Sequence, residues 1–351
     1  MSVQISSAKS KEVGLMGDNK NIIAMFTEPH KIKLIKNSTS ATEEEYVYIE
    51  YLYCGICGGD YSVYRGYRQS YPVSLGHEFI AKVIAVGKSV TNIHPGQYVV
   101  SDFNYRCNEC IFCKTNRSHL CIKNDVGLFS NRGFARYANV HSSYLVPIKP
   151  PEYLPRACLI EPLSCVIHAC NTAGIHQGMN ILICGGGGIG MLFCFLLRSI
   201  YKEISITLAE ENPNKSKLLC DHFLIQPYVS GSNNIYDLIV DCSNSITGLR
   251  FALDCAQRGN RVCVMSHLYG LDTTFVYEQA CKKELRCSFP LRNGERNNLR
   301  LADEYLEQYW LKEYDDMLIV YDDVIAAFKE KEENQFCKQI VQSSSLCITE
   351  L

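Results

Sequence analysis

The sequence predicts an α/β protein of two domains, a β-rich, barrel-like half followed by a doubly wound parallel sheet. The chain has 351 residues, which is longer than one typical domain core. From residue 22 to about residue 150, short β-prone runs alternate with turn residues, and helical periodicity is scarce. From about residue 151, strand-like runs alternate with segments of helical spacing, which is the pattern of a parallel sheet with crossover helices.

The predicted strands follow in chain order. In the first half we expect them at "EYVYIEYLYC", "FIAKVIAVG", "GQYVVSDF" and "YLVPIK". In the second half we expect them at "NILIC", "ISITLAE", "YDLIVDC" and "RVCVMS". After "LRCSF" the chain returns to mixed structure and ends in the strand candidate "CKQIVQ". Asn212 followed by Pro213 predicts a helix start, because asparagine caps a helix and proline fits its first turn.

One crossover is shorter than this pattern requires. Between "HFLIQPYVS" and "YDLIVDC" only "GSNNI" remains. A parallel crossover generally needs about a dozen residues or more, usually helical. We therefore expect the helix at this point to be missing or reduced to a turn.

The bulk composition excludes several classes of function. The formal net charge of −2 and a pI near 6.5 give no long-range attraction to nucleic acid or anionic membranes. Residues 1–20 lack the apolar core of a secretory signal and predict a polar N-terminal arm. The apolar stretch Ile181–Leu197 fits a buried strand, turn and helix better than a membrane span. With nineteen cysteines and no signal, metal ligation and buried thiols in the cytoplasm are favoured over disulfides.

The stretch "CGGGGIG", residues 184–190, lies between a predicted strand and a predicted helix. Gly185, Gly187 and Gly190 satisfy G-x-G-x-x-G, whose glycines allow a tight turn, close approach of a pyrophosphate, and packing of helix on strand. Glu210 ends the next strand, where a carboxylate binds the ribose hydroxyls of NAD and repels the 2′-phosphate of NADP. The pattern favours NAD binding in a Rossmann domain over a purely structural turn.

Four cysteines on one short loop predict a structural zinc site. The stretch "CNECIFCKTNRSHLC" has the spacing C-x2-C-x2-C-x7-C, in a lobe at about residues 104–122. Four thiolates suit tetrahedral zinc and leave no open position for chemistry. A nucleic-acid zinc knuckle is disfavoured, because basic residues are few and no aromatic and basic face surrounds the segment. The expected ligands are Cys107, Cys110, Cys113 and Cys121.

Three further stretches carry metal-binding residue types. "CGICGGD" and "LGHEF" supply Cys57, His77 and Glu78, and "EPLSC" supplies Glu161. Taken singly, each has a simpler interpretation as a buried thiol, a core histidine or a solvated carboxylate. Together with the cysteine loop and the glycine motif, over roughly residues 21–351, they resemble the zinc-dependent medium-chain dehydrogenase/reductase superfamily of alcohol, sorbitol and threonine dehydrogenases. The stretch "EPLS", with its glutamate, resembles the polyol and threonine dehydrogenases within this superfamily.

The resemblance implies a catalytic zinc site with defined roles. Cys57 matches the thiolate ligand and His77 the imidazole ligand. Glu161 matches the third protein position and binds zinc directly or through its water. Glu78 can join or leave the zinc shell in this branch, and Asp60 matches a carboxylate that orients the histidine. Such an ion lowers the pKa of the substrate hydroxyl, so that a hydride can pass to the nicotinamide.

The resemblance also implies a domain arrangement and further cofactor contacts. A GroES-like catalytic domain is expected to comprise residues 21–155 and 288–351, and the Rossmann NAD-binding domain residues 156–287. Cys54 and His168 are expected to pack rather than to bind metal. The cofactor contacts expected beyond the glycine motif are Gly188, Ile189, Lys215, Cys242 and Ser266.

The chain departs from the family pattern just after the cysteine of the catalytic site. Where the family has Ser or Thr two residues on, and often His three beyond that, this chain has Gly59 and Ser62. Glycine has no hydroxyl with which to start a proton relay. Ser62, Tyr61 or Tyr64 could stand in, a substrate hydroxyl and water could carry the proton, or the alcohol chemistry could be impaired. We favour the second, because a polyol brings its own second oxygen and glycine makes room for it.

These observations predict an NAD- and zinc-dependent dehydrogenase acting on a secondary alcohol of a polyol, sugar or aminocyclitol. The alternatives are a threonine-type amino-alcohol dehydrogenase and a catalytically silent member that binds NAD. We expect a small hydroxylated substrate, no nucleic acid or membrane partner, and a homodimer or homotetramer. The loop residues Arg65, Arg68 and Arg292 suggest a polar or anionic ligand, although such arginines are more often solvated charges than substrate clamps.

Overall fold

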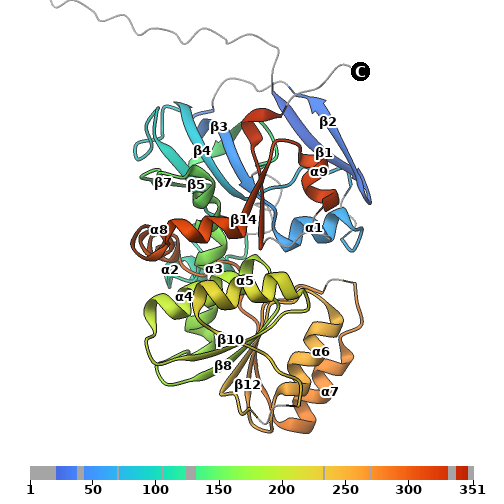
Figure 1. The fold of residues 1–351 in the computed structure, drawn as a ribbon. Coiled ribbons are helices and arrows are strands. Elements are labelled where there is room, and N and C mark those ends of the chain that lie inside the picture. Colours follow the sequence, from blue (N-terminus) through green and yellow to red (C-terminus); the bar gives the residue numbers. More distant parts are fainter. Residues whose placement is uncertain are drawn as a thin grey trace, which may run out of the picture.

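In the computed structural model the chain folds into two units that pack against each other, one above the other in Figure 1. The upper unit combines the blue-to-green N-terminal strands with the red C-terminal segment, and the lower unit holds the yellow and orange part of the chain. The predicted polar arm at residues 1–20 lies outside the described residues. These are residues 21–37, 43–68, 71–104, 106–123, 132–231, 234–268, 270–330 and 337–346.

The upper unit is built on a mostly antiparallel sheet of seven strands. Its strand order is β14-β15-β3-β4-β5-β7, with β6 paired to β3. Four of these strands lie where the first half of the sequence predicts them, and β15 lies in "CKQIVQ". The bounds are β3 (Tyr46–Gly55), β4 (Glu78–Val86), β5 (Tyr98–Ser101), β6 (Tyr137–His141), β7 (Leu145–Ile148), β14 (Leu318–Tyr321) and β15 (Lys338–Val341).

Aromatic side chains fill the core of the upper unit. The rings of Phe26, Phe134 and Phe328 are fully buried, with ring centroids 5.0 to 6.4 Å apart. Phe26 comes from the first hairpin and Phe328 from α9, so the C-terminal segment completes a core built mainly by the N-terminal half. The remaining elements of this unit are β1 (Ile22–Glu28), β2 (Lys31–Lys36), α1 (Gly58–Tyr64), α2 (Ile111–Lys114) and α9 (Val324–Lys329).

The lower unit is a six-stranded parallel sheet with helices on both faces. Its strand order is β10-β9-β8-β11-β12-β13. α4 and α5 cover one face, and α6 and α7 cover the other (Figure 1). This arrangement confirms the doubly wound sheet predicted from the sequence. The bounds are β8 (Asn180–Cys184), α4 (Gly188–Ile200), β9 (Ser205–Ala209), α5 (Pro213–Phe223), β10 (Gln226–Pro227), β11 (Leu238–Asp241), α6 (Ile246–Cys255), β12 (Arg261–Val264), α7 (Thr274–Lys283) and β13 (Arg286–Ser288).

Two local predictions in this unit are also confirmed. Between β10 and β11 the described residues, 228–231 and 234–237, contain no helix. α5 begins after its N-cap Asn212, whose side chain accepts hydrogen bonds from the N–H groups of Asn214 and Lys215. The apolar stretch of residues 181–197 forms β8, the glycine turn and most of α4. Within the described ranges, no helix is both long enough and apolar enough to cross a bilayer.

Two helices lie where the units meet, α3 (Ile160–Ala173) and α8 (Asn297–Tyr309). α3 packs against both α8 and α4. It belongs to one buried cluster that includes Ile80 from the upper unit and Leu192 from the lower unit. This shared core holds the two units against each other and so fixes the walls of the space between them. Short 3-10 turns occupy Ser118–Leu120, Ser142–Tyr144, Leu154–Leu159, Lys312–Met317 and Ser343–Ser345.

Candidate functional site

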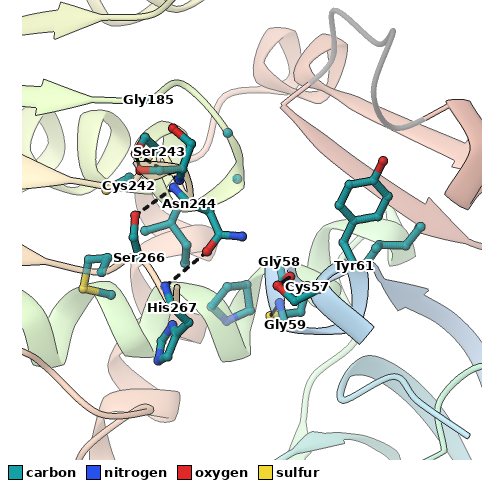
Figure 2. Close-up of a pocket in the computed structure, with 18 of the residues that line it drawn as sticks. Cys57, Gly58, Gly59, Tyr61, Gly185, Cys242, Ser243, Asn244, Ser266 and His267 are labelled. Carbon is teal, nitrogen blue, oxygen red and sulfur yellow. Dashed lines mark hydrogen bonds between the residues drawn. The ribbon is translucent and has the colours of Figure 1, made fainter. Parts of the chain in front are cut away.

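A cavity of about 990 Å³ lies between the two units. One wall comes from the start of α1 and the residues before β4, and the other from the glycine turn and the residues that follow β9, β11 and β12 (Figure 2). The walls approach closely at one point, because a Cβ added to Gly58 would lie 3.5 Å from Nδ2 of Asn244. From β8 the chain adds β9 and β10 on one side of the sheet and then crosses to add β11 on the other side, so the strand order reverses between β8 and β11. Ligands of such sheets bind beyond the carboxyl ends of the strands at that point.

Cys57, His77 and Glu78 form a group of metal-type ligands in this cavity. One candidate ligand atom of each lies within 4.8 Å of the other two. Cys57 is the N-cap of α1, and its Sγ accepts a hydrogen bond from the Gly59 N–H at 3.4 Å. In the antiparallel pairing of β3 with β4, Gly55 lies opposite Glu78. This register brings Cys57, two residues after Gly55, close to His77, the residue before Glu78. The register of one strand pair therefore assembles the group.

Glu161 lies in the same cavity but is not in this group of three. It is buried in the first turn of α3, where Sγ of Cys165 donates a hydrogen bond to its Oε1 at 3.5 Å. Burial raises the pKa of Glu161 to about 7, although the charge on His77 opposes the shift. Among the described residues the structure thus groups Cys57 and His77 with Glu78. The resemblance implied Glu161 as the third position, bound directly or through water, and Glu78 as a ligand that can join or leave, so which glutamate binds zinc directly stays a prediction.

The electrostatics of the group suit a cation. Burial lowers the pKa of His77, but the charges of Cys57 and Asp60 outweigh burial and hold this pKa well above its usual value. Surroundings that retain a proton this firmly also stabilise a metal cation in its place. A thiolate, an imidazole and a carboxylate are donor types of catalytic zinc sites, which keep one position for substrate. The residues present therefore fit zinc.

Asp60 lies where it can orient both Cys57 and His77. Its Oδ2 accepts a hydrogen bond from the Cys57 backbone N–H at 3.1 Å, which completes a capping box at the start of α1. Its Oδ1 lies 3.8 Å from Nδ1 of His77. Burial raises the pKa of Asp60, and the charge on His77 opposes this shift. A carboxylate in this position fixes the ring of a metal-binding histidine.

Lys338 is a buried residue of this site that the sequence analysis did not single out. Its Nζ donates hydrogen bonds to Glu78 and, at 3.2 Å, to the carbonyl of Ile56. The same side chain approaches the glycine turn, because a Cβ added to Gly188 would lie 3.2 Å from Cδ of Lys338. The signal that could have revealed it is a lysine close to the buried-type residues Ile340 and Val341 in the strand candidate "CKQIVQ".

The alternative proton donors near Cys57 differ in their availability. Oγ of Ser62 donates to the Gly58 carbonyl at 3.0 Å, so this hydroxyl is bonded within α1. The ring of Tyr61 projects away from Cys57 (Figure 2). At Gly59 an added Cβ would meet only Sγ of Cys57, at an ordinary 3.7 Å. The glycine therefore leaves room beside the thiol.

The glycine turn has the geometry of a phosphate-binding loop. Gly185 has a φ of +98°, and a Cβ added to Gly190 would lie 1.9 Å from the Gly185 carbonyl oxygen. Both positions therefore require glycine. At Gly187, the N-cap of α4, nothing lies within 4 Å of an added Cβ. The helix N-terminus thus opens into free space, where unpaired N–H groups favour an anion.

Glu210 follows β9 directly and faces this turn. Its Oε2 accepts a hydrogen bond from the Gly186 N–H at 2.5 Å, and its Oε1 accepts one from the Asn212 N–H at 2.9 Å. The carboxylate is thereby held at the edge of the cavity. The other predicted cofactor contacts, Gly188, Ile189, Lys215, Cys242 and Ser266, also line the cavity.

Asn244 and His267 line the cavity without having been anticipated from the sequence. Oγ of Ser266 accepts a hydrogen bond from the Asn244 N–H at 2.7 Å, and the Asn244 Oδ1 accepts one from the His267 N–H at 3.1 Å (Figure 2). Asn244 has a left-handed φ of 50°. These bonds hold the segment after β11 against the segment after β12, at the point where Asn244 faces α1.

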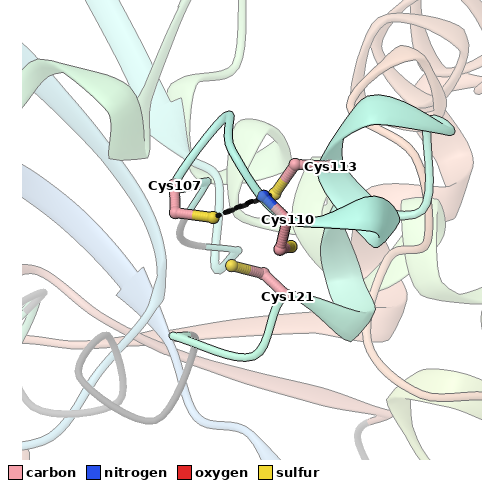
Figure 3. A group of neighbouring side chains, drawn as sticks. All are labelled: Cys107, Cys110, Cys113 and Cys121. Carbon is pink, nitrogen blue, oxygen red and sulfur yellow. Dashed lines mark hydrogen bonds between the residues drawn. The ribbon is translucent and has the colours of Figure 1, made fainter.

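The second group of metal-type ligands lies in the cysteine lobe (Figure 3). The Sγ atoms of its four cysteines lie within 4.8 Å of one another. The pKa of Cys110 is lowered to about 6, mainly by a hydrogen bond from the Cys113 backbone, and this favours the thiolate. Burial raises the pKa of Cys113 to about 12 in the absence of a metal, so the grouping of the four sulfurs, rather than their pKa values, is what fits a closed tetrahedral zinc site. The cysteines are Cys107, Cys110, Cys113 and Cys121, and none of them lines the cavity.

The packing expected of two other residues is seen in the structure. Cys54 is fully buried, and its Sγ donates to the Gly55 carbonyl at 3.6 Å. The ring of His168 packs edge-on against His119, with centroids 4.7 Å apart. Neither residue belongs to a group of metal-type ligands within the described part of the chain.

Comparisons with known proteins match part of the upper unit to a described domain and parts of the chain to dehydrogenases. Residues 43–150 match the alcohol dehydrogenase GroES-like domain. D-arabinitol dehydrogenase 1 of Uromyces fabae is 29% identical over 49% of this chain and 50% of the relative. Sorbitol dehydrogenase of Halalkalibacterium halodurans is 26% identical over 68% of this chain and 74% of the relative. The match to the first of these spans only half of that enzyme's length.

A solved structure extends the likeness to nearly the whole fold. The acetophenone reductase of Geotrichum candidum, solved in complex with NAD, has a TM-score of 0.79 at 18% identity. The match covers 92% of this chain and 97% of that chain. The upper unit accordingly has a GroES-like fold, and the lower unit is a Rossmann-like sheet.

Proposed function

We propose that the chain is a member of the medium-chain dehydrogenase/reductase superfamily and that it oxidises a secondary alcohol of a polyol, sugar or aminocyclitol with zinc and NAD; the GroES-like match, the sorbitol dehydrogenase relative and the shared fold support this. One observation carries the proposal: Cys57, His77 and Glu78 lie together in the cavity that is also lined by the glycine turn, which has the geometry of a phosphate-binding loop. A metal-type group and a dinucleotide-type loop facing one cavity suit hydride transfer between an alcohol and a nicotinamide.

The chain's own residues supply position and charge for this reaction. Bound zinc contributes Lewis acidity, which lowers the pKa of a substrate hydroxyl. Asp60 accepts a hydrogen bond from the Cys57 backbone N–H and lies beside the His77 ring, which holds both residues in place, and Lys338 balances the charge of Glu78. The cavity between α1 and Asn244 would hold the substrate, and the glycine turn would hold NAD. The hydride of the carbinol carbon would pass to bound NAD and the hydroxyl proton would leave to solvent, so that the alcohol and NAD would give a ketone, NADH and a proton.

The proton leaves through the substrate's own neighbouring hydroxyl and water. Ser62 is bonded to the Gly58 carbonyl, and Gly59 has no hydroxyl but leaves space beside Cys57. A second substrate oxygen fits this space, which is why a polyol suits the site better than a simple alcohol. The alternative of a catalytically silent member that binds NAD rests on Gly59, which has no hydroxyl to start a proton relay, and the experiment below decides between the two functions.

The proposed cofactor is NAD rather than NADP. Glu210 presents a carboxylate at the edge of the cavity after β9, where it can accept bonds from ribose hydroxyls and repel a 2′-phosphate. The chain has no arginine between Tyr201 and Cys220 to pair with such a phosphate. We expect Glu210→Ala to reduce the preference for NAD over NADP, measured as the ratio of the two kcat/KM values.

The proposal includes a second, structural zinc and a division into domains. Cys107, Cys110, Cys113 and Cys121 hold the second ion. The catalytic domain comprises residues 21–155 and 288–351, and the cofactor domain residues 156–287. In support, the seven-stranded sheet draws on the first two ranges, and the parallel sheet runs from β8 to β13, which ends at Ser288. The oligomeric state remains a prediction.

The experiment that tests the function uses NADH absorbance with purified, zinc-replete protein. NAD and NADP are each offered with a panel of polyols, sugars, aminocyclitols and amino alcohols. We expect NADH from at least one polyol-type substrate and a loss of this activity in Cys57→Ala. The matched control is Cys54→Ala, which removes the buried thiol of the same "CGIC" stretch and retains activity. Absence of any hydride transfer in the wild type would establish the silent alternative.

A further inference from the structure

We propose that Arg292 binds an anionic group on the substrate, so that the preferred substrate is a polyol carrying a phosphate or a carboxylate rather than a neutral polyol. The inference rests on the proposed dehydrogenase function and deepens it, because it names the substrate class. Arg292 lines the cavity that holds Cys57, His77 and Glu78. Three observations support the assignment: its distance from His77, the way its loop is held, and the charge of the surrounding cavity.

Phe103 links Arg292 to the metal-type group. The Phe103 ring stacks on the His77 imidazole, with centroids 4.3 Å apart and planes at 28°. The Arg292 guanidinium lies over the same phenyl ring, 5.5 Å from its centroid. These two steps place the guanidinium within about 10 Å of the imidazole. A carbon–carbon bond spans about 1.5 Å, so a group three to five bonds from the oxidised carbon reaches Arg292 when the carbinol lies beside His77.

The loop that carries Arg292 is held in an unfavourable conformation by buried contacts. Arg292 has a φ of +57°, in the left-handed region that residues with a Cβ rarely adopt. The next residue, Asn293, is fully buried, and its amide contacts Asp102 at 3.3 Å and Asn104. Nδ2 of Asn298 also donates to the Asn293 carbonyl at 2.8 Å. Strain maintained in this way beside a cavity is typical of a ligand-binding position.

The same contacts also fix the position of Phe103. Asp102, which pairs with Asn293, immediately precedes Phe103 in the chain. Its carboxylate further pairs with Arg106 at 2.6 Å and lies 3.6 Å from Arg296. One buried network therefore sets both the ring and the guanidinium that lies over it, and it does so before any substrate binds. Pre-organisation of this kind lowers the entropy lost when an arginine binds an anion.

The cavity around Arg292 is positively charged on the substrate side. Arg65 and Arg68, which follow α1, line the same cavity and add two further guanidinium groups to it. The carboxylates lining this side, Asp60, Glu78 and Glu161, lie around the metal-type group, where a dication balances them. A guanidinium binds phosphate or carboxylate through two parallel hydrogen bonds, whereas a neutral hydroxyl accepts only one. Anionic polyols are therefore the better match.

The test compares matched substrates with zinc-replete protein and saturating NAD. Each set contains a neutral C5 or C6 polyol, its terminal phosphate and the corresponding aldonate, which separates phosphate from carboxylate as the anionic group. We expect one anionic form to exceed the neutral polyol at least about 30-fold in kcat/KM, the size of a charge-assisted interaction. Arg292→Gln should abolish this advantage through a rise in KM for the anionic substrates, so that anionic and neutral polyols then have similar kcat/KM values. Arg292→Lys should retain part of it.

Control measurements separate this inference from the proposed function. Arg258→Gln removes an exposed arginine of the cofactor unit and should change nothing. If all members of a set react equally, or if Arg292→Gln affects neutral and anionic substrates alike, the inference is wrong and the dehydrogenase function stands. If no substrate reacts, the function itself fails. Calorimetric binding of inorganic phosphate to the wild type, weakened at least about tenfold in Arg292→Gln, then still decides whether Arg292 binds an anion.

Discussion

The chain assembles its two groups of metal-type ligands in opposite ways. Cys107, Cys110, Cys113 and Cys121 come from fifteen consecutive residues of one lobe, outside the cavity. The other group takes its thiol from the N-cap of α1 and its imidazole and carboxylate from the start of β4. A closed set of four cysteines can bind an ion locally. The other set exists only after β3 and β4 have paired beside the cofactor unit.

The surroundings of the two groups differ as much as their assembly. Glu78 is buried against Lys338, and the cavity beside the group leads to the glycine turn. The cysteine lobe instead places Ile111 and Ile122 at its surface, 62% and 70% exposed. A closed thiolate site stabilises a fold, whereas a site with an open position serves chemistry. The comparison therefore predicts that loss of one group removes activity and loss of the other removes stability.

The largest expected effect is that of Cys57→Ala on activity. We expect kcat/KM for the best polyol to fall at least about 1,000-fold, because a metal supplies several kcal/mol of charge stabilisation and each 1.4 kcal/mol is tenfold in rate. Thermal unfolding should change little, since the cysteine lobe remains intact. NADH absorbance and calorimetry measure the two quantities. An equal loss of activity and stability would show that the two groups do not divide the roles.

The reciprocal change is Cys110→Ser in the lobe. We expect one zinc fewer per chain and a loss of about 3 kcal/mol in the free energy of unfolding, as for removal of a structural ion. Activity per folded molecule should fall less than about tenfold, because none of the four cysteines lines the cavity. Metal analysis by mass spectrometry and denaturant unfolding measure the outcome. Unchanged unfolding in the zinc-depleted variant contradicts a structural role for this group.

A smaller effect is expected at Gly59, beside the metal-type thiol. Gly59→Ser adds a hydroxyl where only Sγ of Cys57 lies near, at 3.7 Å. We expect turnover of a simple secondary alcohol to rise about tenfold through general acid–base assistance, while polyol oxidation stays unchanged. Steady-state kinetics on both substrates decides this. Ser62→Ala is the companion variant, and a large loss there would transfer the proton relay to Ser62.

The smallest effect concerns a carboxylate remote from both groups. Burial raises the pKa of Asp303 on α8 to about 6, and the nearby Glu307 and Glu304 add to the shift. Because the pKa of this acid is higher folded than unfolded, ionisation of Asp303 destabilises the fold increasingly from about pH 4 to pH 6, and fully above that. Lys149 and Arg156 line the same small cavity but pair with Glu307 and Asp315.

Asp303→Asn should therefore raise the free energy of unfolding by about 1 kcal/mol at neutral pH, and by less at about pH 5. Denaturant unfolding at the two pH values measures the difference. The zinc content should stay the same, which separates this pH effect from protonation of the metal-type ligands. A variant whose gain does not depend on pH would show that packing, rather than charge, is responsible.

Features written in short stretches of sequence could be predicted, and features set by long-range pairing could not. The parallel sheet, the glycine turn and the missing crossover helix follow from local periodicity and spacing. The grouping of Glu78 rather than Glu161 with His77 depends on the β3–β4 register. Lys338 meets Glu78 across 260 residues. No local pattern encodes such a pair.

The position of Arg292 illustrates the same limit. Its sequence context, "PLRNGE", suggests a polar or anionic ligand but does not distinguish a substrate contact from a solvated loop charge. Its orientation over Phe103 depends on a left-handed backbone and on a buried contact between Asn293 and Asp102, 191 residues apart. Asn244 and His267 lie in the cavity for a comparable reason, since the segments after β11 and β12 meet only in the folded sheet. These residues give the cavity its chemistry, and the fold alone reveals them.

The most direct test removes zinc in steps while NADH formation from a polyol is followed. A chelator should take the ion of the open Cys57 group first, because the four-thiolate site is closed. We expect activity to fall in proportion to the first ion lost per chain and to return when zinc is restored. Loss of this first ion should leave the unfolding temperature nearly unchanged. Full activity after that ion has left would contradict the assignment of the chemistry to Cys57, His77 and Glu78.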